Sequence, residues 1–259
     1  MDYHIAALPF ATALAVGMLI CLEIGRHQGI RRRRKDPQGA MSGVGVVEAA
    51  VFGLYGLLLA FTFSGAPARL DIRRQLIGDE ASAIDTAYLR LDLLPAGSQS
   101  ALRELFRKYL DSRLEVYRKL PDIEAAKAEL SKCEKLQRDV WGQAVAATHL
   151  EGTHPDAGKL LLPALNEMID ITTRRAMAMR IHPPRIIFGL LFLLALVCSL
   201  LAGYSMAGSK QRSWMHITAF VTISVISVYV ILDIEYPRHG LITVNAYDQV
   251  LIEVRESMQ

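Results

Sequence analysis

The segment from Gly43 to Leu94 constrains the fold more than any other part of the chain. It begins with an apolar run, GVGVVEAAVFGLYGLLLAFTFSGA, and passes across Pro67 into a charged amphipathic run, ARLDIRRQLIGDEASAIDTAYLRLDLL. The apolar part is long enough to cross a hydrocarbon core, which takes about 20 residues of helix. The segment therefore predicts one long helix that begins inside a bilayer and ends in water.

Three more apolar runs approach or reach this length, and they account for much of the 52% hydrophobic content. The four predicted spans are residues 5–24, 44–66, 186–207 and 214–234. A polar region without alternating strand pattern separates the second span from the third. The expected fold class is an all-α polytopic membrane protein, with four transmembrane helices in a 2+2 arrangement and an inserted helical soluble domain.

The expected domains follow from this division. They are a transmembrane hairpin at 1–66, a soluble amphipathic helical domain at 67–183, a second transmembrane hairpin at 184–235, and a C-terminal tail at 236–259.

Basic residues follow the first apolar run, whereas a cleaved signal peptide carries them before a shorter run. The first run is therefore expected to be a retained span. Its basic cluster is expected to contact anionic lipid head groups. The cluster consists of Arg31, Arg32, Arg33, Arg34 and Lys35.

Basic residues near the span ends are equally numerous on the two sides of the predicted membrane. Because the positive-inside rule weights short loops over long domains, it favours a cytoplasmic first turn, with the helical domain outside. The expected location is the cell (inner) membrane.

The second span has two notable faces. Small residues recur three or four apart on one face, which lets another helix approach closely in lipid. They are Ala49, Gly53, Gly56, Ala60 and Ser64. A neighbouring face carries the pore or gate candidates Glu48, Phe52, Tyr55 and Leu59, followed by Thr62. Both faces could pack within one subunit, or several copies could surround an axis with Phe52, Tyr55 and Leu59 as an apolar constriction.

Glu48 is an ionisable residue near one end of this span. It lies about one turn inside the apolar boundary, from which its carboxylate could reach head groups or Lys35. A pore or proton-handling role is the alternative.

The polar region reads as four amphipathic helices. The first continues the second span with a predicted buried stripe of Leu70, Ile77, Ala81, Ile84, Tyr88 and Leu91. Ser98 is expected to cap the second helix and Asp122 the third. Their predicted buried residues are Leu102, Leu105, Phe106, Tyr109 and Leu110 in the second, and Ile123, Ala126, Leu130, Cys133, Leu136, Val140 and Ala144 in the third.

At the exit of the last span, Asp233 and Glu235 precede Arg238. These vestibule candidates are expected at head-group depth, where pairing with Arg238 or another arginine lowers the cost of the carboxylates; an ion-binding vestibule is the alternative. The tail predicts a short β-type run and then a brief amphipathic helix that docks against the helical domain.

No metal site and no cofactor are expected. The loop HLEGTHPD holds His149, Glu151, His154 and Asp156, but their spacing matches no metal-site pattern. Motifs of hydrolases, transferases and dinucleotide-binding proteins are absent, so an enzyme is not expected. The net charge of +3 does not favour nucleic acid as a partner.

The stretch LLLAFTFSGAPARLDIRRQLIGDEASAIDTAYLRLDLLP carries a family resemblance, together with LRELFRKYLDSRL and ILDIEYPRHGLITV. It resembles the bestrophin-like domain family of bacterial multi-pass membrane proteins, over nearly the whole chain. That family is named for distant similarity to the bestrophin anion channels, which are pentamers whose second span lines the pore and whose intervening helices are cytoplasmic. The cluster at Arg31 to Lys35 departs from that orientation, and no bestrophin ligand or gate motif matches a residue here.

Two functions are consistent with these features. One is a homo-oligomeric ion channel, for anions by resemblance, with the second span lining the pore. The other is a non-conducting membrane sensor or assembly scaffold that acts through the helical domain. The expected partners are the lipid bilayer, further copies of the chain and, for a channel, ions.

Overall fold

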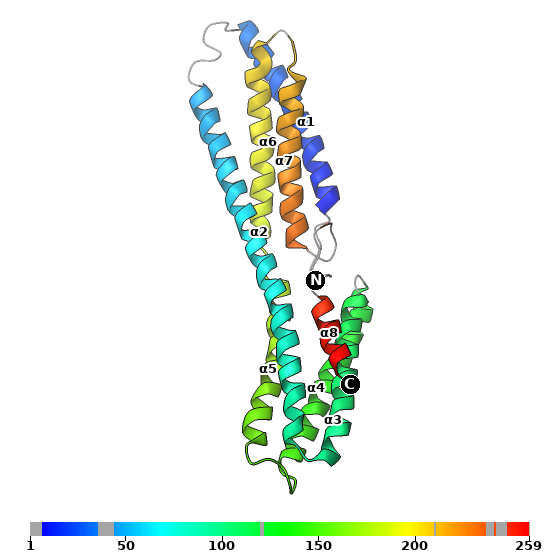
Figure 1. The fold of residues 1–259 in the computed structure, drawn as a ribbon. Coiled ribbons are helices and arrows are strands. Elements are labelled where there is room, and N and C mark those ends of the chain that lie inside the picture. The colour runs from blue at the N-terminus through cyan, green and yellow to red at the C-terminus, as the bar shows by residue number, and fades with distance from the viewer. Residues whose placement is uncertain are drawn as a thin grey trace. The chain divides into compact units, whose positions relative to one another are not determined.

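The structure is a computed structural model that describes residues 7–35, 44–119, 122–209, 211–236, 241 and 248–258. These residues form helices and no strand, which confirms the all-α class (Figure 1). The helices are α1 (Ala7–Lys35), α2 (Val44–Leu89), α3 (Ala96–Arg118), α4 (Ile123–Thr148), α5 (Ala157–Arg180), α6 (Arg185–Ser205), α7 (Trp214–Glu235) and α8 (Gln249–Ser257), with short 3-10 helices η1 (Arg90–Leu93) and η2 (Met206–Gly208).

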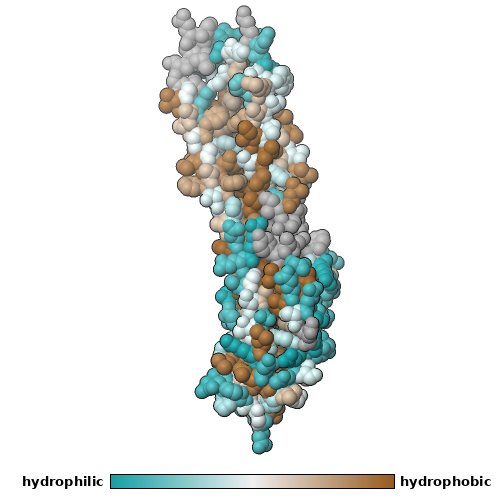
Figure 2. All heavy atoms as spheres, in the orientation of Figure 1, coloured by the Kyte–Doolittle hydropathy of each residue, from teal (hydrophilic) through white to brown (hydrophobic). Residues whose placement is uncertain are grey.

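The chain divides into two compact units. The membrane unit comprises Met1–Ala68 and His182–Tyr236, and the helical unit comprises Arg69–Ile181 and Pro237–Gln259. Hydrophobic residues dominate the visible surface of the membrane unit, whereas hydrophilic residues dominate that of the helical unit (Figure 2). The predicted domain boundaries and the 2+2 arrangement stay predictions.

Four helical segments are long and apolar enough to cross a membrane, and they contain α1, α2, α6 and α7. Each covers all or most of one of the apolar runs from which a span is predicted. A chain with several such helices is a multi-pass membrane protein, because each helix satisfies its own backbone groups where no water is available.

The helix α2 is continuous over 46 residues and includes Pro67. This confirms the prediction of one long element. Proline removes one backbone donor from a helix and usually bends or breaks it, yet the α-helix continues on both sides of Pro67. The amphipathic half of α2 therefore directly extends its apolar half.

The helices α1 and α6 approach each other closely in the membrane unit. A Cβ atom placed on Gly25 would lie 1.9 Å from the carbonyl oxygen of Leu200, and one on Gly203 would lie 2.0 Å from that of Leu22. Only glycine allows backbones this near. Since apolar burial gives helices in lipid no drive to associate, close backbone packing of this kind stabilises their contact.

The core of the helical unit follows the predicted stripes in most positions. All six predicted residues from Leu70 to Leu91 are at most 6% exposed, and Phe106 and Tyr109 are fully buried. Leu130 is a wrong prediction, since its side chain is 36% exposed at the edge of the α4 stripe.

One predicted helix cap is confirmed and one is wrong. The side chain of Asp122 accepts hydrogen bonds from the backbone N–H groups of Glu124 and Ala125, as an N-cap does. Ser98 does not cap α3, because that helix begins two residues earlier, at Ala96, after Pro95.

The last described helix, α8, packs on α3, which confirms the predicted docking of the tail. Leu251 is fully buried, and Arg255 donates from Nε to Oδ1 of Asp111 at 2.7 Å. The predicted β-type run before α8 lies almost entirely outside the described residues.

Candidate functional site

The small-residue face of α2 is not covered by the other helices of the membrane unit. Its five residues, Ala49, Gly53, Gly56, Ala60 and Ser64, are all exposed. A Cβ atom on Gly53 or Gly56 would meet nothing within 4 Å. This face therefore differs from Gly25 of α1 and Gly203 of α6, which pack against the neighbouring helix inside the subunit.

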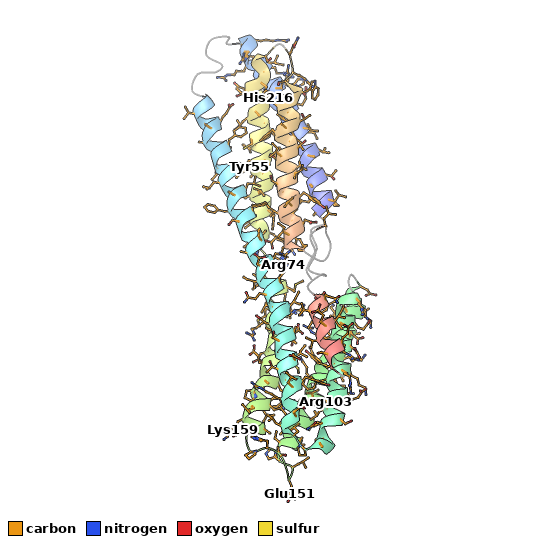
Figure 3. All side chains as sticks on the ribbon, in the orientation of Figure 1. Tyr55, Arg74, Arg103, Glu151, Lys159 and His216 are labelled. Atoms are coloured by element: carbon orange, nitrogen blue, oxygen red, sulfur yellow. The ribbon has the colours of Figure 1, made fainter. Side chains whose placement is uncertain are left out.

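The face with the gate candidates packs inside the subunit instead. Tyr55, labelled in Figure 3, is 5% exposed, and Thr62 is 7% exposed. The Phe52 ring lies against the Phe220 ring of α7, with centroids 5.7 Å apart, and Leu59 is half-buried. Of the two faces of α2, the one with Tyr55 and Thr62 therefore packs within the subunit, whereas the small-residue face does not.

Glu48 contacts α6. The hydroxyl of Ser205 lies 2.6 Å from both carboxylate oxygens of Glu48 and donates to them. A hydroxyl donor offsets part of the cost of placing a carboxylate near the membrane interior. This contact holds the first turns of α2 beside the end of α6.

The acidic pair at the end of α7 is buried. Asp233 is 3% exposed and Glu235 is fully buried. Nδ1 of His182 lies 3.5 Å from Oε2 of Glu235, and the His182 ring stacks on Tyr236 with centroids 4.8 Å apart. The pair therefore belongs to a packed polar cluster of the membrane unit, and an open vestibule would require rearrangement. The third vestibule candidate, Arg238, lies outside the described residues.

The basic cluster forms the end of α1. Helix α1 continues past the predicted limit of the first span, and Arg32, Arg33, Arg34 and Lys35 make up its last turn. Cations at this end of a helix are favourable, because the helix dipole places partial negative charge there. Four of the five side chains are exposed, as contact with lipid head groups requires, and Arg33 is half-buried.

The helical unit contains a buried ionic cluster that the helical stripes did not indicate. Glu80 of α2 is fully buried and forms ion pairs with both Arg113 of α3 and Arg175 of α5. Nε of Arg113 donates to Oε1 of Glu80 at 2.6 Å, and Arg175 donates from Nη1 to Oε2. One carboxylate thus joins three helices of the unit.

Electrostatics favour the charged form of Glu80. Burial by itself raises the pKa of a carboxyl group, but the two guanidinium groups outweigh it and hold the pKa of Glu80 below its ordinary value. A second carboxylate, Glu129, accepts hydrogen bonds from Lys119, Ser112 and Lys132, which lower its pKa to about 2. Both groups are therefore ionised at neutral pH.

Comparison with known proteins identifies the family of this chain. A family model described as the Bestrophin-like domain matches residues 12–247. The chain belongs to the bestrophin-like family. The match includes all of α2 and all of α7, and hence residues of both units. No curated protein and no solved structure matches the chain significantly.

Within the described part of this bestrophin-like protein, no group of three or more His, Cys, Asp or Glu side chains could hold a metal ion. In the loop between α4 and α5, Nδ1 of His149 hydrogen bonds with the Val145 carbonyl oxygen, and Nδ1 of His154 accepts from the Asp156 backbone. These interactions are those of a polar loop.

Two structural features of this bestrophin-like protein were missed by sequence reasoning. The spacing of Gly25 and Gly29 is a GxxxG pattern, which is typical of close helix contacts in membranes and could have indicated the α1–α6 contact. The cluster around Glu80 left no such signal, because its three residues are far apart in sequence and each lies among other charged residues.

Proposed function

We propose that this bestrophin-like protein is a homo-oligomeric ion channel, for anions, in which α2 of each copy lies at a shared axis. The observation that carries the proposal is the low burial of α2 in a single chain. In its most apolar 18-residue stretch, 11% of the residues are buried, compared with 22–39% in the corresponding stretches of the other three candidate spans. Of the four spans, α2 therefore offers the largest share of its residues to further copies.

The rotation of α2 decides which residues would line the axis. Phe52 and Tyr55 pack toward α7 and the subunit interior, so the exposed small-residue face is the one available to neighbouring copies. A constriction of Phe52, Tyr55 and Leu59 stays a proposal that requires α2 to rotate about its own axis. Because successive residues of an α-helix are about 100° apart around its axis, a rotation of this size would move the neighbouring residue position to the shared axis. The choice of anions rests on the family resemblance.

A non-conducting assembly scaffold or sensor is the second candidate. One observation favours it: the small-residue face of α2 carries no charged side chain, and the exposed residues beside it, such as Leu57 and Phe61, are apolar. Such a face can pack directly against a copy of itself and leave no aqueous path.

A bulky residue on this face is expected to disrupt assembly. Gly56→Leu should convert a ring of several copies into smaller species, because the leucine side chain would separate the neighbouring helices. Native mass spectrometry in mild detergent measures the copy number, and chloride flux into liposomes measures conduction. We expect on the order of a tenfold loss of flux in the variant.

The matched control is Gly189→Leu on α6, where a Cβ would likewise meet nothing within 4 Å. This variant is expected to keep the copy number and the flux of the parent protein. A parent protein that is monomeric in mild detergent would contradict the channel. A stable ring without chloride flux would select the scaffold.

The location in the cell (inner) membrane and the orientation are also proposals, with the end of α1 cytoplasmic and the helical unit outside. Ser100, exposed on α3, offers a labelling position. In a chain with Cys21, Cys133 and Cys198 replaced by serine, Ser100→Cys is expected to react with an impermeant maleimide added to intact cells. Reaction only after the cells are opened would reverse the orientation.

A further inference from the structure

The helical unit contains a cavity of about 420 Å³ between α3, α4 and α5. Its volume lies in the range of small-molecule sites, roughly 300–1,000 Å³. The residues that line it include Arg113, Tyr117, Cys133, Gln137, Arg175 and Met177.

Two buried guanidinium groups face this cavity. Arg113 is 5% exposed and Arg175 is 7% exposed. Both lie over the ring of Tyr117, with Cζ atoms 5.3 Å and 4.7 Å from its centroid. The aromatic ring and the two guanidinium groups thus form one polar wall that is fixed in place by its own packing.

The carboxylates that hold these arginines do not line the cavity. Glu80 pairs with both guanidinium groups, and Oδ1 of Asp248 lies 3.7 Å from Nη2 of Arg175. Glu80 engages Nε and Nη2 of Arg113, and no residue of the described chain accepts from its Nη1. The arginines are therefore oriented by acids outside the lining and retain N–H donors for an anion.

The remaining walls of the cavity are mostly apolar. Val116, Leu130 and Ile169 lie along them, and Met177 at the rim is 60% exposed. Methionine adapts its shape to varied apolar partners. The exposed rim also carries Arg180 and Glu134, so three arginines and one glutamate line the cavity.

We propose that this cavity binds a small amphipathic carboxylate. The carboxylate group pairs with the guanidinium groups of Arg113 and Arg175, and the apolar body lies along α4 and α5. An inorganic anion can pair with the guanidinium groups but has no apolar body, and an alcohol has the apolar body but no carboxylate. The binding does not depend on channel activity, and its test needs none.

The chain provides its own reporter for this test. Trp141 lines a depression that shares Glu134, Gln137 and Ile169 with the cavity. Since the chain has two tryptophans, Trp214→Phe leaves Trp141 as the only one. Hexanoate is added to the full-length protein in detergent at about pH 7, where the carboxylate is ionised, and Trp141 fluorescence is recorded.

We expect a saturable change with hexanoate and none with hexanol, hexylamine or sulfate at equal concentration. Hexanol that saturates at the same concentration as hexanoate would overturn the carboxylate assignment. The absence of any saturable change with hexanoate would overturn the proposal.

Two variants locate the binding without touching the ionic cluster. Ala176→Leu places a larger side chain in the cavity lining and should weaken hexanoate binding on the order of tenfold. Arg180→Gln removes a rim charge and should weaken it up to about fivefold. Their controls are Ala128→Leu and Arg174→Gln, exposed residues outside the lining. Equal affinities for Ala176→Leu and Ala128→Leu would place hexanoate elsewhere and overturn the proposal.

Discussion

Replacing Glu80 with glutamine is expected to lower the stability of the helical unit by roughly 3 kcal/mol or more, because it leaves the buried guanidinium group of Arg113 without its carboxylate partner and that of Arg175 with only Asp248. Glu80 is fully buried and Arg113 and Arg175 are nearly so, so water replaces the lost charge only in part. For a unit of this size the change corresponds to a fall in melting temperature of about 10 °C. Thermal unfolding of the full-length protein, followed by far-UV circular dichroism, measures it.

The same variant should change the pH dependence of stability. Because the pKa of folded Glu80 is held below its ordinary value of 4.5 by Arg113 and Arg175, its contribution is fully present above that value. The contribution disappears as the pH falls through the lower folded pKa. The melting temperatures of parent and Glu80→Gln should therefore converge below about pH 4.5. Glu129 titrates in the same acid range in both proteins and cancels in the difference.

Glu167→Gln is the matched control for this experiment. Glu167 also pairs with an arginine, Arg174, but both side chains are about half exposed. Exposed pairs contribute at most about 1 kcal/mol. If the two glutamine variants melted at the same temperature, the cluster around Glu80 would not be an important source of stability.

The second large effect is expected at Gly203, where α6 meets α1. An alanine Cβ there would lie 2.0 Å from the carbonyl oxygen of Leu22, which is far inside the contact distance of the two atoms. The helices would have to separate and lose their close packing, at a cost of about 1–3 kcal/mol or more. Gly203→Ala is expected to reduce the yield of folded, monodisperse protein in size-exclusion chromatography and to lower its melting temperature.

Gly189 provides a control on the same helix. A Cβ at this position meets nothing within 4 Å, and alanine favours a helix over glycine by about 0.5–1 kcal/mol. Gly189→Ala should therefore leave the protein unchanged or slightly more stable. Effects of the same sign and size at both positions would contradict the close α1–α6 contact.

The helices could be predicted from sequence because their signals are local. Long apolar runs indicate spans, and apolar residues three or four apart indicate the buried stripe from Leu70 to Leu91. Errors occurred at edges. Leu130 continues the α4 pattern but is partly exposed, and Ser98 resembles a cap inside a helix that begins at Ala96.

The candidate site was less predictable because it depends on how helices rotate against each other. The sequence indicates two faces of α2, one with Gly53 and one with Tyr55. It does not indicate which of the two faces packs against α7. The structure turns Tyr55 inward and leaves Gly53 exposed. The choice depends on side-chain packing across distant segments, such as Phe52 against Phe220.

The sequence alone determined the membrane class, the positions of the apolar helices and the continuity of α2, because hydrophobic length and helical period act within one segment. Only the tertiary structure decided the contact of α1 with α6, the free face of α2, and the cavity beside Arg113 and Arg175. These features depend on atoms from segments far apart in the chain. Their energies come from close packing and from charge pairs in low dielectric, which no single segment contains.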